Sequence, residues 1–128
     1  MNYLIIGCGP MGAGVAAALD NIGHAVTLVD KDAGALAHLE PRLRPRLIVG
    51  SAFDRGILQR AGIETVDGLA AMTHSDEGNV VTARLARMVF QVPRVVARLC
   101  DPGKIEIYRR LGIQVAVPLS WSVNRFVE

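Results

Sequence analysis

The sequence predicts a doubly wound α/β fold, in which a six-stranded parallel sheet carries helices on both faces. Six short runs rich in Val, Ile and Leu recur along the 128 residues, most of them nearly continuous in apolar character. Such runs are typical of strands buried on both faces of a parallel sheet. Segments with helical spacing separate the runs, and a glycine-rich turn, LIIGCGPMGAG at residues 4–14, directly follows the first run.

The predicted strands are, in order, 3–7, 25–30, 46–50, 68–73, 94–99 and 113–117. Crossovers between parallel strands are right-handed in nearly all proteins, so the expected strand order is 3-2-1-4-5-6. In a Rossmann-like sheet of this order, ligands bind where the order reverses, between the first and fourth strands. The strand pattern therefore predicts the place of a site as well as the fold.

Five helices are expected between the strands. The first spans 11–23, ends at Gly23, and places on one stripe Met11, Val15, Leu19 and Ile22. The second spans 32–40, from the N-cap Asp32 to the residue before Pro41. The others span 54–62, 75–90 and 101–112, and the core stripe expected of the fourth is Val81, Leu85, Met88 and Val89.

Residues 1–117 are expected to form one nucleotide-binding domain, and residues 118–128 to begin a C-terminal crossover helix. This tail carries Trp121, Val123, Phe126 and Val127. Apolar surface of that size is unusual on a monomer, so another chain or domain is expected to cover it. The tail and the fifth helix, with Ile105, Ile107, Tyr108 and Leu111, are the candidates for a dimer contact.

Size and composition argue against several functions. A dehydrogenase normally adds a substrate domain to its nucleotide-binding half, and 128 residues leave no room for one. The formal charge is +2, and Arg42, Arg44 and Arg46 lack interleaved aromatics, so a solvated turn is preferred to a nucleic-acid surface. The sequence shows no recognisable signal peptide and no apolar run as long as a membrane-spanning helix needs. We therefore expect a cytoplasmic protein without membrane insertion.

The cysteines and histidines do not predict a catalytic or metal centre. Cys8 and Cys100 form no CxxC pair, and both are interpreted as small buried fillers instead of nucleophiles. With three scattered histidines, no metal constellation is expected. His74 falls where a ligand would lie, but the chain supplies no pocket wall for a substrate, so a ligand contact is preferred to a catalytic role.

The glycine turn matches the dinucleotide-binding pattern G-x-G-x-x-G at Gly7, Gly9 and Gly12, after a predicted strand and at the start of a predicted helix. The first glycine permits the turn, the second lets a pyrophosphate approach the backbone, and the third lets helix and strand pack closely. The free N–H groups and the positive dipole end of that helix would bind the phosphates.

Asp30 ends the second predicted strand, 18 residues after Gly12. A carboxylate there would accept hydrogen bonds from the adenosine ribose and repel a 2′-phosphate, which favours NAD-type or adenosine nucleotides over NADP. The alternative is that Asp30 merely ends its strand and caps the following turn.

Longer segments of the chain resemble the N-terminal RCK domain, also called KTN or TrkA-N, of potassium channel and transporter regulators. The resemblance rests on IIGCGPMG, LVDKDAGAL, VGSAFDRGILQRAGIETVDGLAAMTHSDEGNVVTARLAR and PRVVARLCDPGKIEIYRRLGIQVAVPLS, which together cover nearly the whole chain. LQRAGI, MTHSDEGN and VARLCDP are more specific than the glycine triplet, because a dehydrogenase fingerprint does not carry them.

The resemblance implies a role for each matching residue. The phosphate loop would comprise Gly7, Cys8, Gly9, Pro10 and Met11, with Gly12 behind it. Asp30 would take the ribose beside Lys31, and Ser51 and Ala52 would line the adenine. Thr73 and His74 would lie under the second half of the ligand, and Arg98 would meet phosphate oxygens in a bidentate way.

Two departures from the family pattern bear on ligand choice. Pro10 stands where the family usually has an arginine, so a terminal phosphate of ATP would be held less well. Ser51 stands where the family usually has a carboxylate, which removes a hydrogen bond to the adenine amino group and weakens binding by roughly 1 kcal/mol.

The sequence thus favours a non-enzymatic sensor. NAD(H) is the leading ligand, with AMP, ADP or ATP as alternatives, and binding would change how two such domains pack, in a dimer or a larger ring. The partner implied by the resemblance is the membrane subunit of a potassium channel or transporter. Two other hypotheses stay open: the cofactor-binding half of a small NAD-dependent oxidoreductase, and a module that has lost binding and only dimerises.

Overall fold

The computed structural model describes residues 1–116 and confirms the predicted doubly wound sheet. All neighbouring strands are parallel, in the order β3-β2-β1-β4-β5-β6. The strands are β1 (Asn2–Ile6), β2 (Ala25–Asp30), β3 (Leu47–Val49), β4 (Gly68–Ala71), β5 (Arg94–Arg98) and β6 (Gln114–Ala116). Each lies within one or two residues of its predicted bounds.

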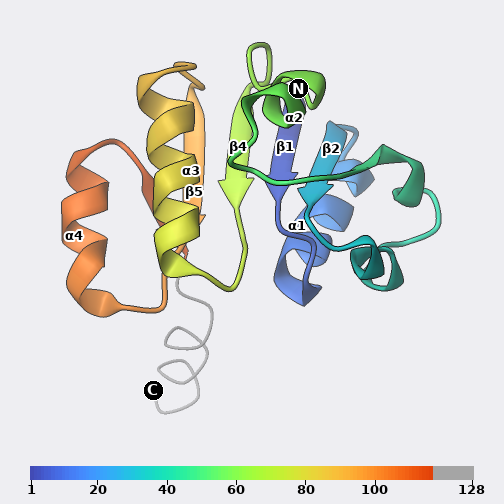
Figure 1. Cartoon of the computed structure of the whole chain (residues 1–128), viewed down its shortest axis with the longest axis horizontal. Helices are drawn as coiled ribbons and strands as arrows, with labels where there is room; N and C mark the ends of the chain where they lie inside the picture. The colour runs from blue at the N-terminus through green and yellow to red at the C-terminus, as the bar shows by residue number, and fades with distance from the viewer. Residues whose placement is uncertain (117–128) are drawn as a thin grey trace.

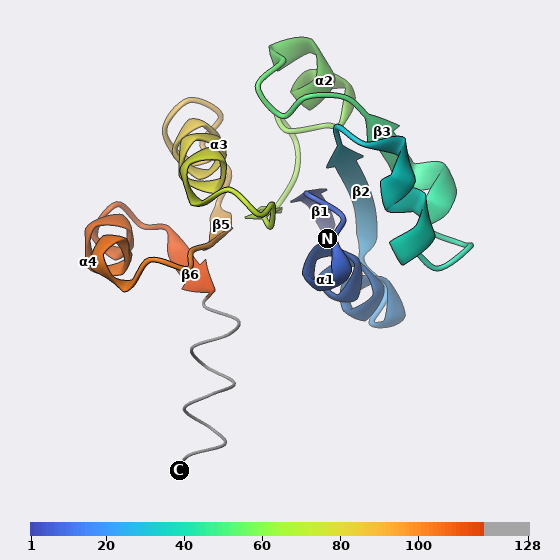
Figure 2. The same ribbon diagram turned by 60° about the horizontal axis from the view of Figure 1, so that its bottom comes forward.

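Helices cover both faces of the sheet. The α-helices are α1 (Pro10–Asn21), α2 (Arg55–Arg60), α3 (Asp76–Met88) and α4 (Pro102–Arg110), and the 3-10 helices are η1 (Ala33–His38) and η2 (Arg44–Arg46). Figure 1 shows α3 in front of β5, and Figure 2 shows α1 on the opposite side of the sheet from α2 and α3. Each face has its own core cluster, because alternate residues of one strand point to opposite faces: Leu4 and Ile6 belong to one cluster and Ile5 to the other.

The stripes predicted for two helices are right only in part. Leu85 packs on one core cluster, and Met11, Val15 and Leu19 pack on the other, but smaller residues form the buried centre of each helix face. On α3 the buried apolar residues are Val80, Ala83 and Ala86, whereas Val81 is 53% and Met88 48% exposed. On α1 the buried face is Gly12, Ala13 and Ala16; Met11, Val15 and Leu19 pack at its margin, and Ile22 is 70% exposed. Small side chains let each helix backbone approach the sheet, so the larger residues flank the contact.

The second predicted helix forms as the 3-10 helix η1. Its predicted N-cap is present, since the side chain of Asp32 accepts a 2.8 Å hydrogen bond from the N–H of Gly34. Only Ala35 of the helix is buried, and Gly34 lowers the helix propensity of so short a segment. Too little of the segment is buried for tertiary packing to stabilise an α-helix here, so the segment forms a 3-10 helix instead.

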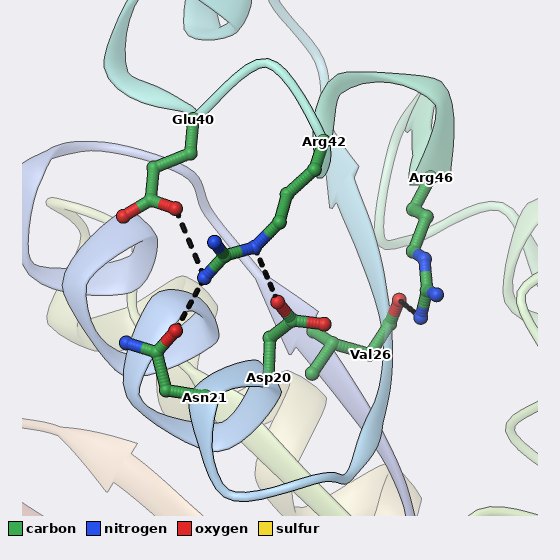
Figure 3. A network of polar contacts seen from close by, with 6 residues as sticks. All are labelled: Asp20, Asn21, Val26, Glu40, Arg42 and Arg46. Atoms are coloured by element: carbon green, nitrogen blue, oxygen red, sulfur yellow. Dashed lines mark hydrogen bonds and ion pairs between the residues drawn. The ribbon is translucent and has the colours of Figure 1, made fainter.

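The arginine-rich turn after η1 is tied to its neighbours. Arg42 Nε lies 2.5 Å from Oδ2 of Asp20, and the same guanidinium contacts Asn21 and Glu40 (Figure 3). Arg46 donates to the carbonyl of Val26 in β2. The turn is exposed as predicted, but its arginines also join the segment before β3 to the end of α1 and to β2.

Several predictions concern the last part of the chain. The predicted crossover helix at 118–128, and with it the domain boundary, lies outside the described residues. The side chains of Tyr108 in α4 and of Leu111 directly after it pack on the domain's own core, whereas Ile107 in α4 is 59% exposed. Within residues 1–116, no helix is long and apolar enough to cross a membrane.

Candidate functional site

A cleft of about 510 Å³ opens at the carboxyl ends of the central strands, at the predicted reversal of strand order. Eight of the predicted site residues line it: Gly7, Gly9, Asp30, Lys31, Ser51, Ala52, Thr73 and His74. The cleft is large enough for part of a nucleotide, and strands β1, β2, β3 and β4 each lead into one segment of its wall.

The glycine loop has the tight geometry that the spacing predicts. Gly7 has φ +94°, and a Cβ on it would lie 2.8 Å from the N atom of Thr73. A Cβ on Gly12 would lie 1.9 Å from the carbonyl oxygen of Gly7. Neither position accepts a side chain, so these two glycines bring β1, α1 and the end of β4 into close contact.

The N-terminus of α1 has no side-chain cap. Gly9 is its N-cap, and Ala13 donates the first intrahelical hydrogen bond to the Gly9 carbonyl at 2.9 Å. The N–H groups of Met11 and Gly12 precede that bond, and Pro10 has none. By contrast, α2, α3 and α4 are capped by the side chains of Asp54, Ser75 and Asp101. The positive end of the α1 dipole therefore lies at the cleft wall that Gly9 contributes.

Asp30 lines the cleft beside the glycine loop and binds two backbone groups. Its Oδ2 accepts a hydrogen bond of 2.8 Å from the N–H of Cys8, and its Oδ1 accepts one of 2.9 Å from the N–H of Asp32. The carboxylate thus holds the glycine loop against the end of β2. Each oxygen has a second lone pair, which leaves the carboxylate able to accept from ligand hydroxyls as well.

Asn79 joins the ends of β4 and β5. It is fully buried, its Oδ1 accepts from the N–H and the hydroxyl of Thr73, and its Nδ2 donates to the carbonyls of Thr73 and Arg98 at 2.9 and 2.8 Å. This residue was missed in the site prediction, although it ends the quoted MTHSDEGN motif. A polar residue on the sheet-facing side of a helix was the available signal, because burial requires it to have partners.

Arg98 does not line the cleft. Its Nη1 donates 2.9 Å to the carbonyl of Thr73 and lies 3.3 Å from Nδ1 of His74. Its Nε is buried and has no hydrogen-bond partner among the described residues. The predicted bidentate contact of Arg98 with phosphate stays a prediction, as do the ligand contacts of Cys8, Pro10, Met11 and Gly12, which also lie outside the lining.

The two cysteines differ. Cys8 is fully buried as predicted, and burial, together with the negative charge of Asp30, raises the pKa of its thiol to about 12. A thiol in this environment stays protonated near neutral pH and is a poor nucleophile. Cys100 is exposed, so the prediction that it is a buried filler is wrong. It lies just past β5 at the N-terminal side of α4, where the chain leaves the sheet.

The cleft also contains residues that sequence reasoning did not select. Phe53, Gly78 and Thr82 line it, and Phe53 is 66% exposed. A Cβ on Gly78 would lie 3.6 Å from the Phe53 ring, so the ring reaches from the loop after β3 to the first turn of α3. The sequence signal that could have identified Phe53 is an aromatic residue directly after Gly50, Ser51 and Ala52. Among the described residues, no group of His, Cys, Asp and Glu is arranged to hold a metal ion.

The sequence profile of the TrkA-N domain matches residues 3–118. The chain belongs to the TrkA-N family. This TrkA-N domain is 36% identical over its whole length to the Trk system potassium uptake protein TrkA of Streptomyces coelicolor, of which it covers 57%. It is 34% identical to TrkA of Mycobacterium tuberculosis and covers 58% of that protein. The chain thus spans little more than half the length of these relatives.

Solved structures share the fold of this TrkA-N domain. The GsuK channel bound to NAD superimposes with a TM-score of 0.81 at 24% identity, over 98% of this chain and 22% of that one. The C-terminal domain of Shewanella denitrificans Kef in its AMP-bound form superimposes with a TM-score of 0.81 at 19% identity, over 98% and 77%. At these identities the likeness establishes the fold.

Proposed function

We propose that this TrkA-N domain binds NAD(H) or an adenosine nucleotide in the cleft and acts as a regulatory sensor of a potassium uptake system. The observation that carries the proposal is the uncapped N-terminus of α1, with the carboxylate of Asp30 lining the same cleft beside the glycine loop. Free amides at a helix start suit a pyrophosphate, and a carboxylate at the end of the next strand suits the ribose hydroxyls.

Family membership supports the regulatory part. The matching relatives are named as Trk system potassium uptake proteins, and neighbours in fold carry NAD or AMP. In this proposal the domain works on the cytoplasmic side of the membrane, beside the membrane subunit of a potassium transporter or channel. Its ligand acts by favouring one packing of the assembled domains over another, since only differential binding shifts an equilibrium.

Assembly into a dimer or a larger ring is part of the proposal. The exposed Ile107 on α4 supports a contact on that helix, and the apolar residues of the tail support a second one. Analytical ultracentrifugation of the full chain and of Ile107→Asp tests this. We expect the variant to shift toward the monomer, and an unchanged assembly would remove α4 from the interface.

The oxidoreductase alternative predicts turnover, and the sensor proposal does not. Cys8 is buried with a protonated thiol, and Nδ1 of His74 is already in contact with Arg98, so neither supports nucleophilic or base catalysis. Hydride exchange between NADH and small carbonyl compounds, followed by NADH absorbance, separates the two. Sustained exchange by the purified domain would overturn the sensor proposal.

Titration calorimetry with NAD, NADH, AMP, ADP and ATP tests binding directly. We expect micromolar or tighter binding of at least one ligand, and weaker binding of ATP than of ADP because Pro10 offers the terminal phosphate neither charge nor an N–H. Absence of heat with every ligand, together with mass spectra that show no nucleotide carried through purification, would favour a module that only dimerises.

A further inference from the structure

His74 and Arg98 form a side-chain pair at the carboxyl ends of β4 and β5. Nη1 of Arg98 lies 3.3 Å from Nδ1 of His74. Arginine has five N–H donors and no acceptor, so the histidine nitrogen in this contact is the acceptor. A neutral imidazole that accepts at one ring nitrogen carries its hydrogen on the other. The contact therefore selects the tautomer with hydrogen on Nε2.

The Nε2 atom faces the glycine loop. A Cβ built on Gly9 would lie 3.5 Å from Nε2 of His74, and both residues line the cleft. Gly9 is the N-cap of α1, whose first amides have no side-chain cap. The imidazole N–H thus lies beside the backbone donors that suit a phosphate group, and it adds a donor from the β4 side.

We propose that His74 donates its Nε2–H to a phosphate oxygen of the bound nucleotide, and that Arg98 is the positioning residue that keeps His74 in this tautomer. The inference rests on the proposed function, because it names a residue of the same cleft. Arg98 acts here through His74, since its Nη1 is engaged by Thr73 and His74 and the residue does not line the cleft.

The structure also provides a way to remove Arg98 without loosening the loop. Nη1 of Arg98 donates to the carbonyl of Thr73, but Nδ2 of Asn79 donates to the same oxygen at 2.9 Å. Arg98→Met therefore leaves the Thr73 carbonyl paired, and it replaces a buried Nε that has no partner among the described residues. Arg98→Lys is the matched variant, because it keeps a charged donor for Nδ1.

The first test measures the tautomer in the unliganded domain. Nitrogen-15 NMR of histidine-labelled protein at neutral pH, with the His74 signals assigned by their loss in His74→Gln, distinguishes protonated from bare ring nitrogens. We expect hydrogen on Nε2 in the wild type and in Arg98→Lys, and a mixture of tautomers in Arg98→Met. Hydrogen on Nδ1 in the wild type, or no change in Arg98→Met, would overturn the positioning role.

The second test measures binding. His74→Gln keeps an N–H near the position of Nε2, whereas His74→Asn keeps one only near Nδ1. For the nucleotide that the wild type binds, we expect His74→Gln to stay within about three-fold of the wild-type Kd and His74→Asn to weaken binding about ten-fold. Equal loss in both variants would overturn the donor role.

The two tests separate this inference from the proposed function. If the wild-type domain binds no nucleotide, the proposed function fails and the donor role fails with it, while the NMR result still decides the tautomer. If nucleotide binds normally to both His74 variants, the proposed function stands and the inference is wrong. Adenosine, which lacks phosphate, should bind the wild type and His74→Asn equally.

Discussion

The backbone N–H of Cys8 donates a hydrogen bond of 2.8 Å to Oδ2 of Asp30. The residue expected to recognise the ribose therefore also holds the glycine loop in place, and a single carboxylate links the ends of β1 and β2. Removing it affects both the loop and the ligand, so the test of its ligand role needs a variant that keeps the loop contact.

Asp30→Ala should weaken NAD(H) binding about ten-fold or more, because a hydrogen bond to a charged group is worth about 1.5 to 3 kcal/mol. Asp30→Asn retains one acceptor oxygen for the Cys8 N–H but loses the charge. It should bind NADP better relative to NAD than the wild type does, since the 2′-phosphate is no longer repelled. Calorimetry measures both, and an unchanged NAD affinity in Asp30→Ala would count against this site.

Two glycines of α1 should respond oppositely to alanine. A Cβ at position 12 would meet the Gly7 carbonyl oxygen at 1.9 Å, whereas a Cβ at Gly14 would meet nothing within 4 Å. Gly12→Ala should cost about 3 kcal/mol or more of unfolding free energy, and Gly14→Ala should add about 0.5 to 1 kcal/mol. Urea unfolding compares them, and a stable Gly12→Ala would contradict the close packing of the loop.

The buried thiol of Cys8 should make the domain less stable in alkali. Its pKa is raised from 9.0 to about 12 on folding, so the unfolded chain loses this proton at lower pH than the folded one. The stabilisation is complete below about pH 9 and declines as the pH rises toward about 12. At about pH 10 the loss should be about 1 kcal/mol.

The free energy of unfolding in urea, measured below and above pH 9, checks this decline. Cys8→Ala is the test variant, and Cys100→Ala, which changes the exposed cysteine, is the control. Compared with the wild type, the fall in unfolding free energy with rising pH should be smaller in Cys8→Ala and unchanged in Cys100→Ala. In the native protein a thiol reagent should modify Cys100 but not Cys8, and reaction of both thiols at equal rates would disprove the burial argument.

Asn79→Ala should destabilise the domain by at least about 2 kcal/mol, because it leaves the N–H of Thr73 without its partner and empties a fully buried side-chain position. Asn21→Ala, at an exposed position of the Arg42 network, should change the unfolding free energy by less than about 0.5 kcal/mol. Thermal and urea unfolding compare them. Equal effects of the two substitutions would show that the hydrogen bonds of Asn79 between the ends of β4 and β5 are unimportant for stability.

Phe53→Ala should weaken AMP binding about five-fold or more if the exposed ring contacts the base, because base–aromatic stacking is worth about 1 to 3 kcal/mol. Phe53→Tyr keeps the ring and should bind as the wild type does. Ribose 5-phosphate has no base, so its affinity should not depend on position 53. A loss that is the same for both ligands would indicate that the ring shapes the loop instead.

Local patterns predicted much of this domain. Apolar runs broken by turn residues predicted all six strands, and the right-handedness of parallel crossovers predicted their order. The spacing of the glycines predicted a tight turn, in which Gly7 and Gly12 have no room for a Cβ in the structure, whereas the ribose contact of Asp30 stays a prediction. These features depend on residues close in sequence or on rules common to all parallel sheets.

Tertiary contacts decided the rest. Which face of α3 is buried depended on how closely the helix approaches the sheet, and Ala83 and Ala86 allow an approach that Met88 does not. Three contacts join segments far apart in the chain: the hydrogen bonds of Asn79, the contact of Arg98 with His74, and the approach of the Phe53 ring to Gly78. The spacing of residues along the chain determines strands, helices and turns. The partner of a polar side chain is determined only when distant strands lie next to one another.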